Sequence, residues 1–310
     1  MRTIAIGKTE LEVPALGVGT WQWGDKGFWG YGQGYGQPDV EAAYRASREA
    51  GLTFFDTAEI YGFGTSERIV GSLVAGDAGP VVIASKFAPL RLTAGTLHGA
   101  LTASLARLGR EQVDLYQIHF PYGVIRIAPL MEALANEVAA GRVRAVGVSN
   151  YSAAQMRRAH ATLARRGVVL ASNQVHYSLL HRQPERNGVL AACRELGVTL
   201  IAYSPLEQGI LTGKYHQGGD GATTSPTRMR RRRTSAARLQ ASAPLLAALR
   251  AVGEAHGGKT PGQVALNWLI HQGVLPIPGA KSAAQASANA GALGWEMSDN
   301  EFERISKAAM

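Results

Sequence analysis

Cysteine is almost absent from this chain, because Cys193 is the only one among 310 residues. A single cysteine cannot form a disulfide within the chain, which excludes a disulfide framework and favours a reducing compartment. No apolar run approaches the roughly 20 residues that a membrane-spanning helix needs. Residues 1–7 lack the apolar core and the cleavage site of a signal peptide. We therefore expect a cytoplasmic protein without a membrane partner.

Two patterns that mark common function classes are missing as well. No Gly-x-Gly-x-x-Gly turn opens a helix after the first expected strand, which argues against an open dinucleotide-binding sheet. No His-x-His pair ends that strand, so a metal-dependent barrel hydrolase lacks its ligands there and no metal site is expected. Acidic residues are comparatively few, and the formal net charge is +9 at pH 7. Such a charge suits an anionic ligand, for example a phosphorylated cofactor, or a polyanion.

Short apolar runs alternate with amphipathic stretches along the whole chain. The expected strands begin near Leu16, Leu52, Val81, Val113, Val143, Leu170, Val198 and Val274. Helical patterns between them include residues 39–50, 97–108, 130–140 and 152–166. Continuous Val, Ile and Leu runs separated by helices are typical of parallel strands covered by helices. The pattern predicts an α/β fold with a single (β/α)8 TIM barrel domain over residues 1–310, with an open doubly wound sheet as the alternative.

Other segments of the chain add detail to this prediction. Residues 3–14 alternate weakly around Gly7 and predict a β-hairpin across the barrel floor. Capping-box sequences predict helix starts at Ser152, Thr260, Ser282 and Ser298. Residues 207–235 interrupt the periodicity, which predicts a long loop at the C-terminal rim of the barrel.

A run of arginines, Arg230–Arg233 with Arg228 before it, lies in this long loop. We interpret the run as a solvated loop, with a clamp over cofactor phosphates as the alternative. Binding to nucleic acid is a third reading of the same residues. No recognised nucleic-acid motif accompanies the run, so no nucleic-acid partner is expected.

Polar residues stand at the ends of the expected strands, which is where barrel enzymes place their chemistry. Asp56, Lys86 and His119 end the second, third and fourth strands, and Tyr61 follows one loop after the second. A lone buried ammonium is costly, so Lys86 must either reach solvent or find an anion, which Asp56 on the adjacent strand can supply. The ammonium would lower the pKa of Tyr61 from about 10 and make its phenol a usable general acid. With His119 to orient a carbonyl, the four residues predict carbonyl reduction.

Each of these residues also has a purely structural explanation. Asp56 could cap a turn or helix, His119 could be a hydrogen-bonded core histidine, and Tyr61 could pack with its hydroxyl at the surface. The other strand ends are also distinctive, with Ser149, Asn150, Gln174, Tyr203, Ser204 and Gly279. The gathering of polar residues at one rim is therefore the observation that favours an active site.

These residues and their surroundings resemble the aldo-keto reductase superfamily over essentially the whole chain. The matching stretches are Leu16-Gly-Val-Gly-Thr-Trp21, Phe55-Asp-Thr-Ala-Glu-Ile-Tyr-Gly62, Ser66-Glu67, Ala84-Ser-Lys86, Gln117-Ile-His119, Gly147-Val-Ser-Asn150, Ala202-Tyr-Ser-Pro-Leu206, Leu211-Thr-Gly-Lys-Tyr215 and Ile277-Pro-Gly279. The resemblance implies a barrel that binds NADPH without a Rossmann domain and reduces a small-molecule aldehyde or ketone. It implies Asp56, Tyr61, Lys86 and His119 as the catalytic tetrad.

The same resemblance implies which residues contact NADPH. Tyr203 would stack on the nicotinamide, and its carboxamide would be held by Ser149, Asn150 and Gln174. The remaining contacts would come from Gly19, Thr20, Trp21, Ser204, Pro205, Leu206, Gly209, Leu211, Lys214, Gly279, Lys281, Ser282, Gln285 and Asn289. Without the resemblance, these residues also have structural explanations. Asn150 could equally be a helix N-cap or turn residue, and Tyr203 could pack in the core. Lys214 could be a surface lysine, and Ser282 and Gln285 could form a capping box.

The adenosine end of the implied site bears on the choice of cofactor. Lys281, next to a helix start at Ser282, would favour NADPH over NADH by binding a 2′-phosphate. The family usually has glutamate before the asparagine, whereas this chain has Ala288 before Asn289. The departure predicts that one contact to the adenine is missing and that the cofactor preference is relaxed.

Aromatic residues gather in the Gly-rich first βα loop, with Trp21, Trp23, Phe28, Trp29, Tyr31 and Tyr35. We expect Trp21, Trp23 and Trp29 to wall a pocket for an apolar or ring-shaped substrate, the alternative being a lid packed on itself. The loop, together with Gly291-Ala-Leu-Gly-Trp295, is similar to the family branch that contains pyridoxal reductases.

A second function class remains beside the reductase. Some barrels that resemble this family, such as potassium-channel β subunits, act as cofactor-sensing or partner-binding proteins with little turnover. The complete set of Asp56, Tyr61, Lys86 and His119 argues against that class. The sequence does not indicate the physiological substrate, the favoured direction of the reaction or an assembly interface.

Overall fold

Eight parallel strands form the main sheet of the structure, a computed structural model that describes residues 1–88, 93–121, 125–216 and 235–309. In chain order they are β3 (Val18–Gly19), β4 (Phe54–Asp56), β5 (Val82–Phe87), β6 (Val113–Ile118), β7 (Val143–Ser149), β8 (Leu170–His176), β9 (Thr199–Tyr203) and β10 (Leu275–Pro276). Each strand pairs in parallel with the next one in the sequence. This is the strand order of a β/α barrel.

The two outer strands of this sheet, β3 and β10, also meet each other. Gly19 and Gly279 form a parallel bridge, and the Gly17 amide donates a hydrogen bond to the Pro276 carbonyl at 3.0 Å. A further bond joins the Gly19 amide to the Pro278 carbonyl at 3.1 Å. The sheet therefore closes on itself. The predicted (β/α)8 barrel is confirmed, and the open doubly wound alternative is wrong.

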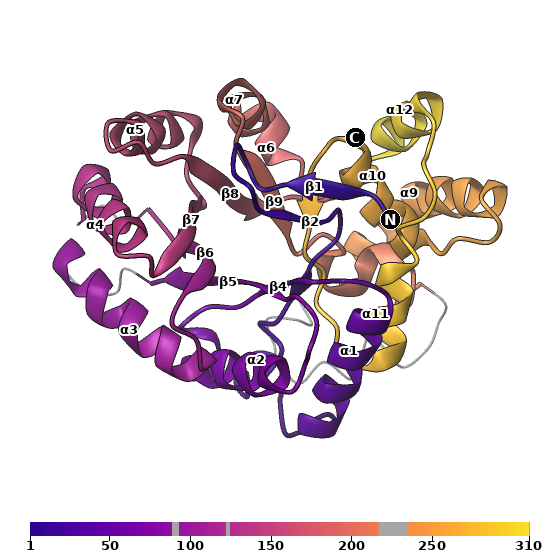
Figure 1. Ribbon diagram of the computed structural model, residues 1–310. Helices are drawn as coiled ribbons and strands as arrows, with labels where there is room; N and C mark the ends of the chain where they lie inside the picture. Colours follow the sequence, from indigo (N-terminus) through magenta and orange to yellow (C-terminus); the bar gives the residue numbers. More distant parts are fainter. Residues whose placement is uncertain (89–92, 122–124, 217–234, 310) are drawn as a thin grey trace.

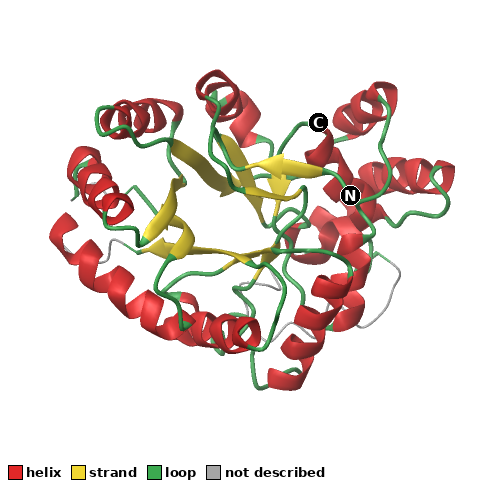
Figure 2. Ribbon diagram, viewed as in Figure 1, coloured by secondary structure: helices red, strands yellow, loops and turns green. Residues whose placement is uncertain are grey.

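Helices surround the barrel on its outer face, as Figure 1 and Figure 2 show. They are α1 (Gln37–Glu49), α2 (Thr65–Ala75), α3 (Leu97–Leu108), α4 (Ile127–Ala139), α5 (Ala153–Ala164), α6 (Gln183–Arg186), α7 (Val189–Leu196), α9 (Ala236–Ala255), α10 (Pro261–His271), α11 (Ala283–Ala290) and α12 (Asp299–Ala308). The 3-10 segments are η1 (Tyr61–Gly64), η2 (Ala94–Thr96) and η3 (Glu207–Thr212). None of the helices in the described ranges is both long and apolar enough to cross a membrane.

The helix boundaries follow the expected ones closely. Helix α1 begins two residues earlier than expected, because Pro38 is tolerated in a first turn. The capping boxes at Ser152, Thr260 and Ser298 are present with both of their hydrogen bonds. At Ser282 only half of the box forms. The side-chain oxygen Oε1 of Gln285 accepts a hydrogen bond from the backbone amide of Lys281 instead of that of Ser282.

The N-terminal residues form the predicted hairpin, in which β1 (Thr3–Ala5) pairs antiparallel with β2 (Glu12–Pro14). Ile6, Leu11 and Val13 of this segment are buried against the inward side chains of the barrel strands. Gly7 has a positive φ of 63°, and a side chain at this position would meet the backbone of Ala171. The hairpin therefore fills one end of the barrel and leaves the C-terminal ends of the strands as the open rim.

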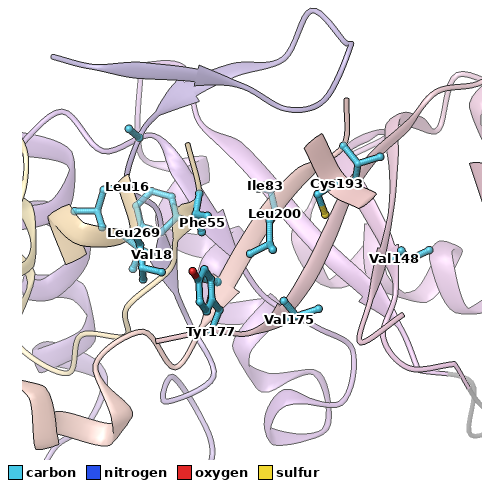
Figure 3. Close-up of a cluster of buried hydrophobic side chains, with 14 of the residues drawn as sticks. Leu16, Val18, Phe55, Ile83, Val148, Val175, Tyr177, Cys193, Leu200 and Leu269 are labelled. Carbon is cyan, nitrogen blue, oxygen red and sulfur yellow. The ribbon is translucent and has the colours of Figure 1, made fainter. Parts of the chain in front are cut away.

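The larger hydrophobic cluster lies between the strands and the helices. Figure 3 shows part of it, with Leu16, Val18, Phe55, Ile83 and Leu200 among the labelled side chains. Phe55 belongs to this outer cluster, whereas its neighbour Phe54 belongs to the interior cluster with the hairpin residues. Side chains alternate between the two faces of a strand, so Asp56 shares the inward face of Phe54. Burial of Phe55 on the outside thus turns Asp56 into the barrel.

An irregularity in β8 determines which of its side chains face inward. Val146 of β7 pairs with Leu170, but the next residue, Gly147, pairs with Ser172, so Ala171 is an extra residue. Ala171 packs in the barrel interior, and Ser172 beyond the bulge donates to Gln117, which is also buried. A bulge shifts the alternation by one residue and re-aims the side chains that follow it. This shift points Gln174 inward rather than outward.

The long loop expected over residues 207–235 starts with η3 and ends where Ser235 caps α9. The arginine run Arg230–Arg233 and Arg228 lie outside the described residues, so the readings of that run are untested.

Candidate active site

A buried ion pair lies at the open rim of the barrel. The Lys86 ammonium, at the end of β5, is 2.5 Å from Oδ1 of Asp56 at the end of β4. It also donates to the Thr57 carbonyl at 2.9 Å. Both charged side chains are almost completely buried, at 0% and 2% exposed. Adjacent parallel strands bring these two strand ends together, as the sequence predicted.

Two amide side chains support the second oxygen of this carboxylate. Nε2 of Gln174 donates to Oδ2 of Asp56 at 2.7 Å, and Nε2 of Gln117 donates to the same oxygen at 3.3 Å. The charge of Asp56 is therefore met by one ammonium and two amides. Gln174 was expected to hold the cofactor carboxamide, whereas in this structure its amide nitrogen is engaged with Asp56. The bulge in β8 is the local cause.

Tyr61 lies in η1, directly after the β4 strand end. Its hydroxyl oxygen accepts a hydrogen bond from the Lys86 ammonium at 3.3 Å. The structure thus joins Asp56, Lys86 and Tyr61 through a single ammonium group. His119 completes the set, since its ring lies edge-on to the Tyr61 ring with centroids 5.7 Å apart. All four residues predicted at the strand ends come together.

The pKa of Tyr61 differs from the expectation. Burial, together with the Asp56 carboxylate, raises the pKa of the Tyr61 hydroxyl well above its usual range. The predicted net lowering of this pKa is wrong for this structure, because burial and the Asp56 carboxylate both disfavour the phenolate. Burial also lowers the pKa of Lys86, and Asp56 and Glu67 oppose that shift. Tyr61 is therefore a protonated phenol at neutral pH.

His119 is a neutral imidazole in this environment. Burial, with a smaller contribution from Lys86, lowers its pKa to about 2. Its Nδ1 is buried and has no hydrogen-bond partner among the described residues. The Phe120 ring stacks on the imidazole with centroids 4.5 Å apart. A neutral ring of this kind can hydrogen-bond a substrate oxygen without giving up a proton.

Polar groups beyond the tetrad continue along the rim at β7 and β9. Asn150 has a left-handed backbone with φ 61°, and its Nδ2 donates to the His119 carbonyl at 3.2 Å. The Tyr203 hydroxyl donates to Oδ1 of Asn150 at 3.1 Å. The Ser149 hydroxyl donates to the Gln174 carbonyl at 2.8 Å. Positive φ outside glycine is uncommon and concentrates at functional sites, which agrees with a binding role at Asn150.

The segment after β9 has an unusual backbone over the residues expected to follow the cofactor. Ser204, Glu207 and Gln208 have positive φ, as does Gly209. Pro205, Gly209 and Leu211 are buried, Leu206 is half-buried, and Lys214 is exposed with its ammonium 4.9 Å from the Tyr215 ring centre.

Glu207 anchors this segment, and sequence reasoning missed its contacts. Its carboxylate accepts from His176 at 2.5 Å, from Ser178 at 2.9 Å and from Arg238 at 2.9 Å. Burial opposes the ionisation of Glu207, but the bonds from His176 and Ser178, together with Arg238, outweigh it and lower its pKa. No periodicity in the sequence signals this cluster, because its members come from the end of β8, the turn after it, η3 and α9.

The residues expected at the adenosine end gather where β10 leads into α11. The Ser282 hydroxyl accepts from the Gln285 amide at 3.3 Å, and Asn289 donates to the Gly279 carbonyl at 3.4 Å. The Lys281 ammonium donates to the Trp29 carbonyl at 3.0 Å and lies 4.1 Å from the Tyr35 ring centre. The first βα loop therefore reaches across to the predicted phosphate contact.

The first and last strand ends are closely packed around Gly19, Gly279 and the Gln22 side chain. A side chain at Gly279 would meet the Gln22 amide, and Oε1 of Gln22 is buried without a hydrogen-bond partner among the described residues. Gly19 is equally restricted, since a side chain there would meet the Ile277 carbonyl. Thr20 is buried and donates to the Asp56 carbonyl at 2.9 Å, so it supports the tetrad. The buried Gln22 oxygen fits a bound nucleotide near Gly279.

The aromatic residues of the first βα loop divide into two groups. Trp21 stacks on Phe28 with centroids 5.0 Å apart, meets Trp29 edge-on at 5.4 Å, and lies 6.1 Å from the Tyr61 ring. Trp23 differs from the expectation, because it is fully buried and its indole N–H donates to the Ala280 carbonyl at 2.8 Å. Trp21 therefore faces the tetrad, whereas Trp23 packs in the core between β3 and β10.

The described residues hold no cluster of three His, Cys, Asp or Glu side chains arranged to bind a metal ion. The chemistry that the site can support is instead proton transfer. A protonated phenol lies within hydrogen-bond distance of an ammonium, and a neutral imidazole lies beside it.

Comparison with known proteins places this arrangement in a family. The family model described as Aldo/keto reductase family matches residues 15–309. The chain is 40% identical over 314 residues to the chloroplastic pyridoxal reductase of Arabidopsis thaliana, covering 96% of this chain and 84% of that protein. It is 32% identical over 301 residues to the methylglyoxal reductase YeaE of Escherichia coli, covering 96% and 92%.

The fold is similar to solved structures as well. An aldo/keto reductase from Klebsiella pneumoniae in complex with NADP and acetate superposes with a TM-score of 0.77 at 29% identity. The match covers 99% of this chain and 95% of that one.

Proposed function

This chain belongs to the aldo/keto reductase family, and we propose that it is an NADPH-dependent reductase of aldehydes or ketones. We propose that residues 1–310 act as a single barrel domain and that the protein works in the cytoplasm. The observation that carries the proposal is the Lys86 ammonium, which contacts both the buried Asp56 carboxylate and the Tyr61 hydroxyl.

The rim residues support NADPH as the cofactor. NADPH, when bound, supplies a hydride to the carbonyl carbon. Asn150 and Tyr203 offer polar and aromatic groups on the nicotinamide side, and the buried Gln22 oxygen beside Gly279 has no hydrogen-bond partner among the described residues. Lys281 and the N-terminus of α11 supply positive charge for a phosphate. The NADP complex of the Klebsiella relative agrees with this choice.

Tyr61 is the proposed general acid. Its raised pKa keeps the proton on the phenol at neutral pH, so the acid form is the populated one. When the proton moves to the carbonyl oxygen, a phenolate remains in a buried site. Lys86 stabilises that phenolate through the contact at 3.3 Å, and Asp56 holds the ammonium in place. Charge stabilisation of this kind acts mainly in the transition state.

His119 is the proposed carbonyl-orienting residue. Because its pKa is lowered to about 2, the imidazole is neutral and does not compete with Tyr61 as a proton donor. The two rings meet edge-on with their centroids 5.7 Å apart, which supports a shared contact with one substrate oxygen. A carbonyl oxygen that bonds to both groups is held in one orientation for hydride transfer.

The aromatic wall favours a flat substrate. Trp21 lies beside Tyr61 and is supported by Phe28 and Trp29. An aromatic aldehyde can stack on such a wall, whereas a small aliphatic carbonyl gains little from it. The Arabidopsis relative is a pyridoxal reductase, and the E. coli relative is a methylglyoxal reductase. We therefore propose that this chain reduces pyridoxal-like aromatic aldehydes better than methylglyoxal.

A substrate panel tests this proposal. Purified protein is mixed with NADPH and a set of aldehydes and ketones that includes pyridoxal and methylglyoxal, and loss of reduced cofactor is followed. We expect turnover, with a higher kcat/KM for pyridoxal. Tight NADPH binding without turnover of any panel member would instead support a cofactor-sensing barrel.

A further inference from the structure

A second cavity lies away from the tetrad, between two neighbouring helices of the outer ring. It has a volume of about 500 Å³ and lies between the N-terminal part of α4 and one face of α5, which pack against each other (Figure 1). Its apolar lining comes mainly from Pro121, Ile125 and Ile127. None of Asp56, Tyr61, Lys86 and His119 lines it. The cavity is large enough to hold a small organic molecule.

The charged groups that line this cavity all have the same sign. Arg126, Arg158 and Arg165 are part of the lining, which contains no carboxylate among the described residues. Arg158 and Arg165 lie seven residues apart on α5, so they share one helix face with the lining residue Thr162. A set of three guanidinium groups around one cavity has a strong preference for an anion.

Two neighbouring arginines, Arg157 and Arg166, differ from Arg158 and Arg165 because they form ion pairs. Arg157 pairs with Glu195 at 2.5 Å, and Arg166 pairs with Glu132 at 2.5 Å. Arg158 and Arg165, next to them in the sequence, form no ion pair with a described carboxylate. The arginines that face neighbouring helices are therefore neutralised, and those that face the cavity are not.

Tyr151 adds an aromatic side chain to the cavity lining. It is 1% exposed, and its hydroxyl has no hydrogen-bond partner among the described residues. Buried polar groups almost always have partners, because leaving one unsatisfied costs free energy. The start of α4 adds further donors, since its N-cap Arg126 makes no side-chain capping bond and the lining residues Ile127 and Ala128 lie in the first turn.

We propose that this cavity binds a small phosphate monoester with an apolar organic part. The phosphate would meet the guanidinium groups of Arg158 and Arg165 and the start of α4. The organic part would lie on Ile125 and Ile127. A dianion uses three arginines more fully than a monocarboxylate does. This site does not depend on the proposed reductase function.

Phenyl phosphate is the probe that tests the site. Calorimetric titration is done with and without saturating NADP⁺, because NADP⁺ fills the phosphate contacts of the proposed cofactor site. Phenol, which has the ring without the charge, and benzoate, which has a single charge, are titrated in parallel. We expect one phenyl phosphate per chain in the presence of NADP⁺, with weaker binding of benzoate and still weaker binding of phenol.

Matched variants decide where the probe binds. Arg158→Ala and Arg165→Ala should each weaken phenyl phosphate by about tenfold, as expected for loss of a charge-assisted hydrogen bond. Arg157→Ala removes the same charge from the same helix outside the cavity and should leave the affinity unchanged.

Two results would overturn the proposal. One is absence of phenyl phosphate binding to the NADP⁺-saturated protein. The other is equal weakening by Arg157→Ala and Arg158→Ala, which would show a general charge effect rather than a site. Thermal unfolding and NADP⁺ affinity of each variant confirm that the fold is intact, and Arg165→Ala provides a second test should Arg158→Ala fail to fold.

Discussion

Removal of one charge from the buried pair is the perturbation with the largest expected effect on stability. In Asp56→Asn, the Lys86 ammonium keeps its hydrogen bonds to the Thr57 carbonyl at 2.9 Å and to the Tyr61 hydroxyl at 3.3 Å. It loses its ion pair with the Asp56 carboxylate at 2.5 Å. Breaking a buried ion pair from one side typically costs about 3–5 kcal/mol. We expect a loss of this size in the free energy of unfolding at pH 7.

The same variant should recover stability as the pH rises. Burial already lowers the pKa of Lys86, and Asp56 is the main group that opposes the shift. Without Asp56, the folded protein releases the Lys86 proton at a lower pH than the unfolded chain, whose lysine has a pKa of about 10.4. The unfolded state then binds more protons, so stability rises with pH between these two pKa values, by up to about 1.4 kcal/mol per pH unit.

The assay is urea unfolding of wild type, Asp56→Asn, Lys86→Met and the double variant at pH 7 and pH 9. The double variant should lose at least about 2 kcal/mol less unfolding free energy than the two single variants lose together, because neither charge is left unpaired. Asp114→Asn is a matched control, because its partner Arg144 is 45% exposed, and it should lose no more than about 1 kcal/mol. Additive single losses, or an Asp56→Asn variant as stable as wild type, would refute the reasoning.

Three other variants test separate parts of the structure. His119 has a pKa lowered to about 2, so it binds a proton when the protein unfolds in acid. Between pH 7 and pH 5, the free energy of unfolding of wild type should therefore fall by about 2 kcal/mol more than that of His119→Asn in urea titrations. A pH-independent difference between the two proteins would contradict this. Lys281→Ala should weaken NADPH more than NADH in fluorescence titrations, and equal weakening would argue against a 2′-phosphate contact. Tyr151→Phe should leave the stability of the ligand-free protein unchanged or raise it by up to about 1 kcal/mol, because it removes a buried hydroxyl without a described partner, and a large loss would reveal a hidden structural bond.

The sequence predicted the barrel, the hairpin and the meeting of the strand ends. These features depend on local alternation and on the rule that parallel strands present their C-terminal ends at one rim. Asp56 and Lys86 were therefore placed together correctly from their positions after apolar runs.

Other properties of the site depend on distances that no pattern in the sequence contains. The pKa of Tyr61 rises rather than falls, because burial and the Asp56 carboxylate both disfavour the phenolate. Gln174 bonds to Asp56 because a bulge shifts the alternation of β8, and nothing in its short apolar run signals an extra residue. Trp23 was expected to wall the pocket with Trp21 and Trp29, but it is buried and bonded to the Ala280 carbonyl. The sequence around these tryptophans does not distinguish the buried one.

The cavity between α4 and α5 shows the same limit on a larger scale. Arg158 and Arg165 come from α5 and its C-cap, and Arg126 is the N-cap of α4, so the set exists only after the two helices pack. The capping box at Ser152 located the start of α5 from the sequence. It could not show which arginines of that region would pair with carboxylates of neighbouring helices, as Arg157 does with Glu195.

Turnover by Tyr61→Phe, measured beside its affinity for NADPH, tests the central claim most directly. The variant removes the proposed proton donor and leaves Lys86, Asp56 and His119 in place. We predict that kcat for the best aldehyde falls by at least about a hundredfold while the Kd for NADPH stays within about twofold of wild type. Turnover within about threefold of wild type would contradict the assignment of Tyr61 as the general acid.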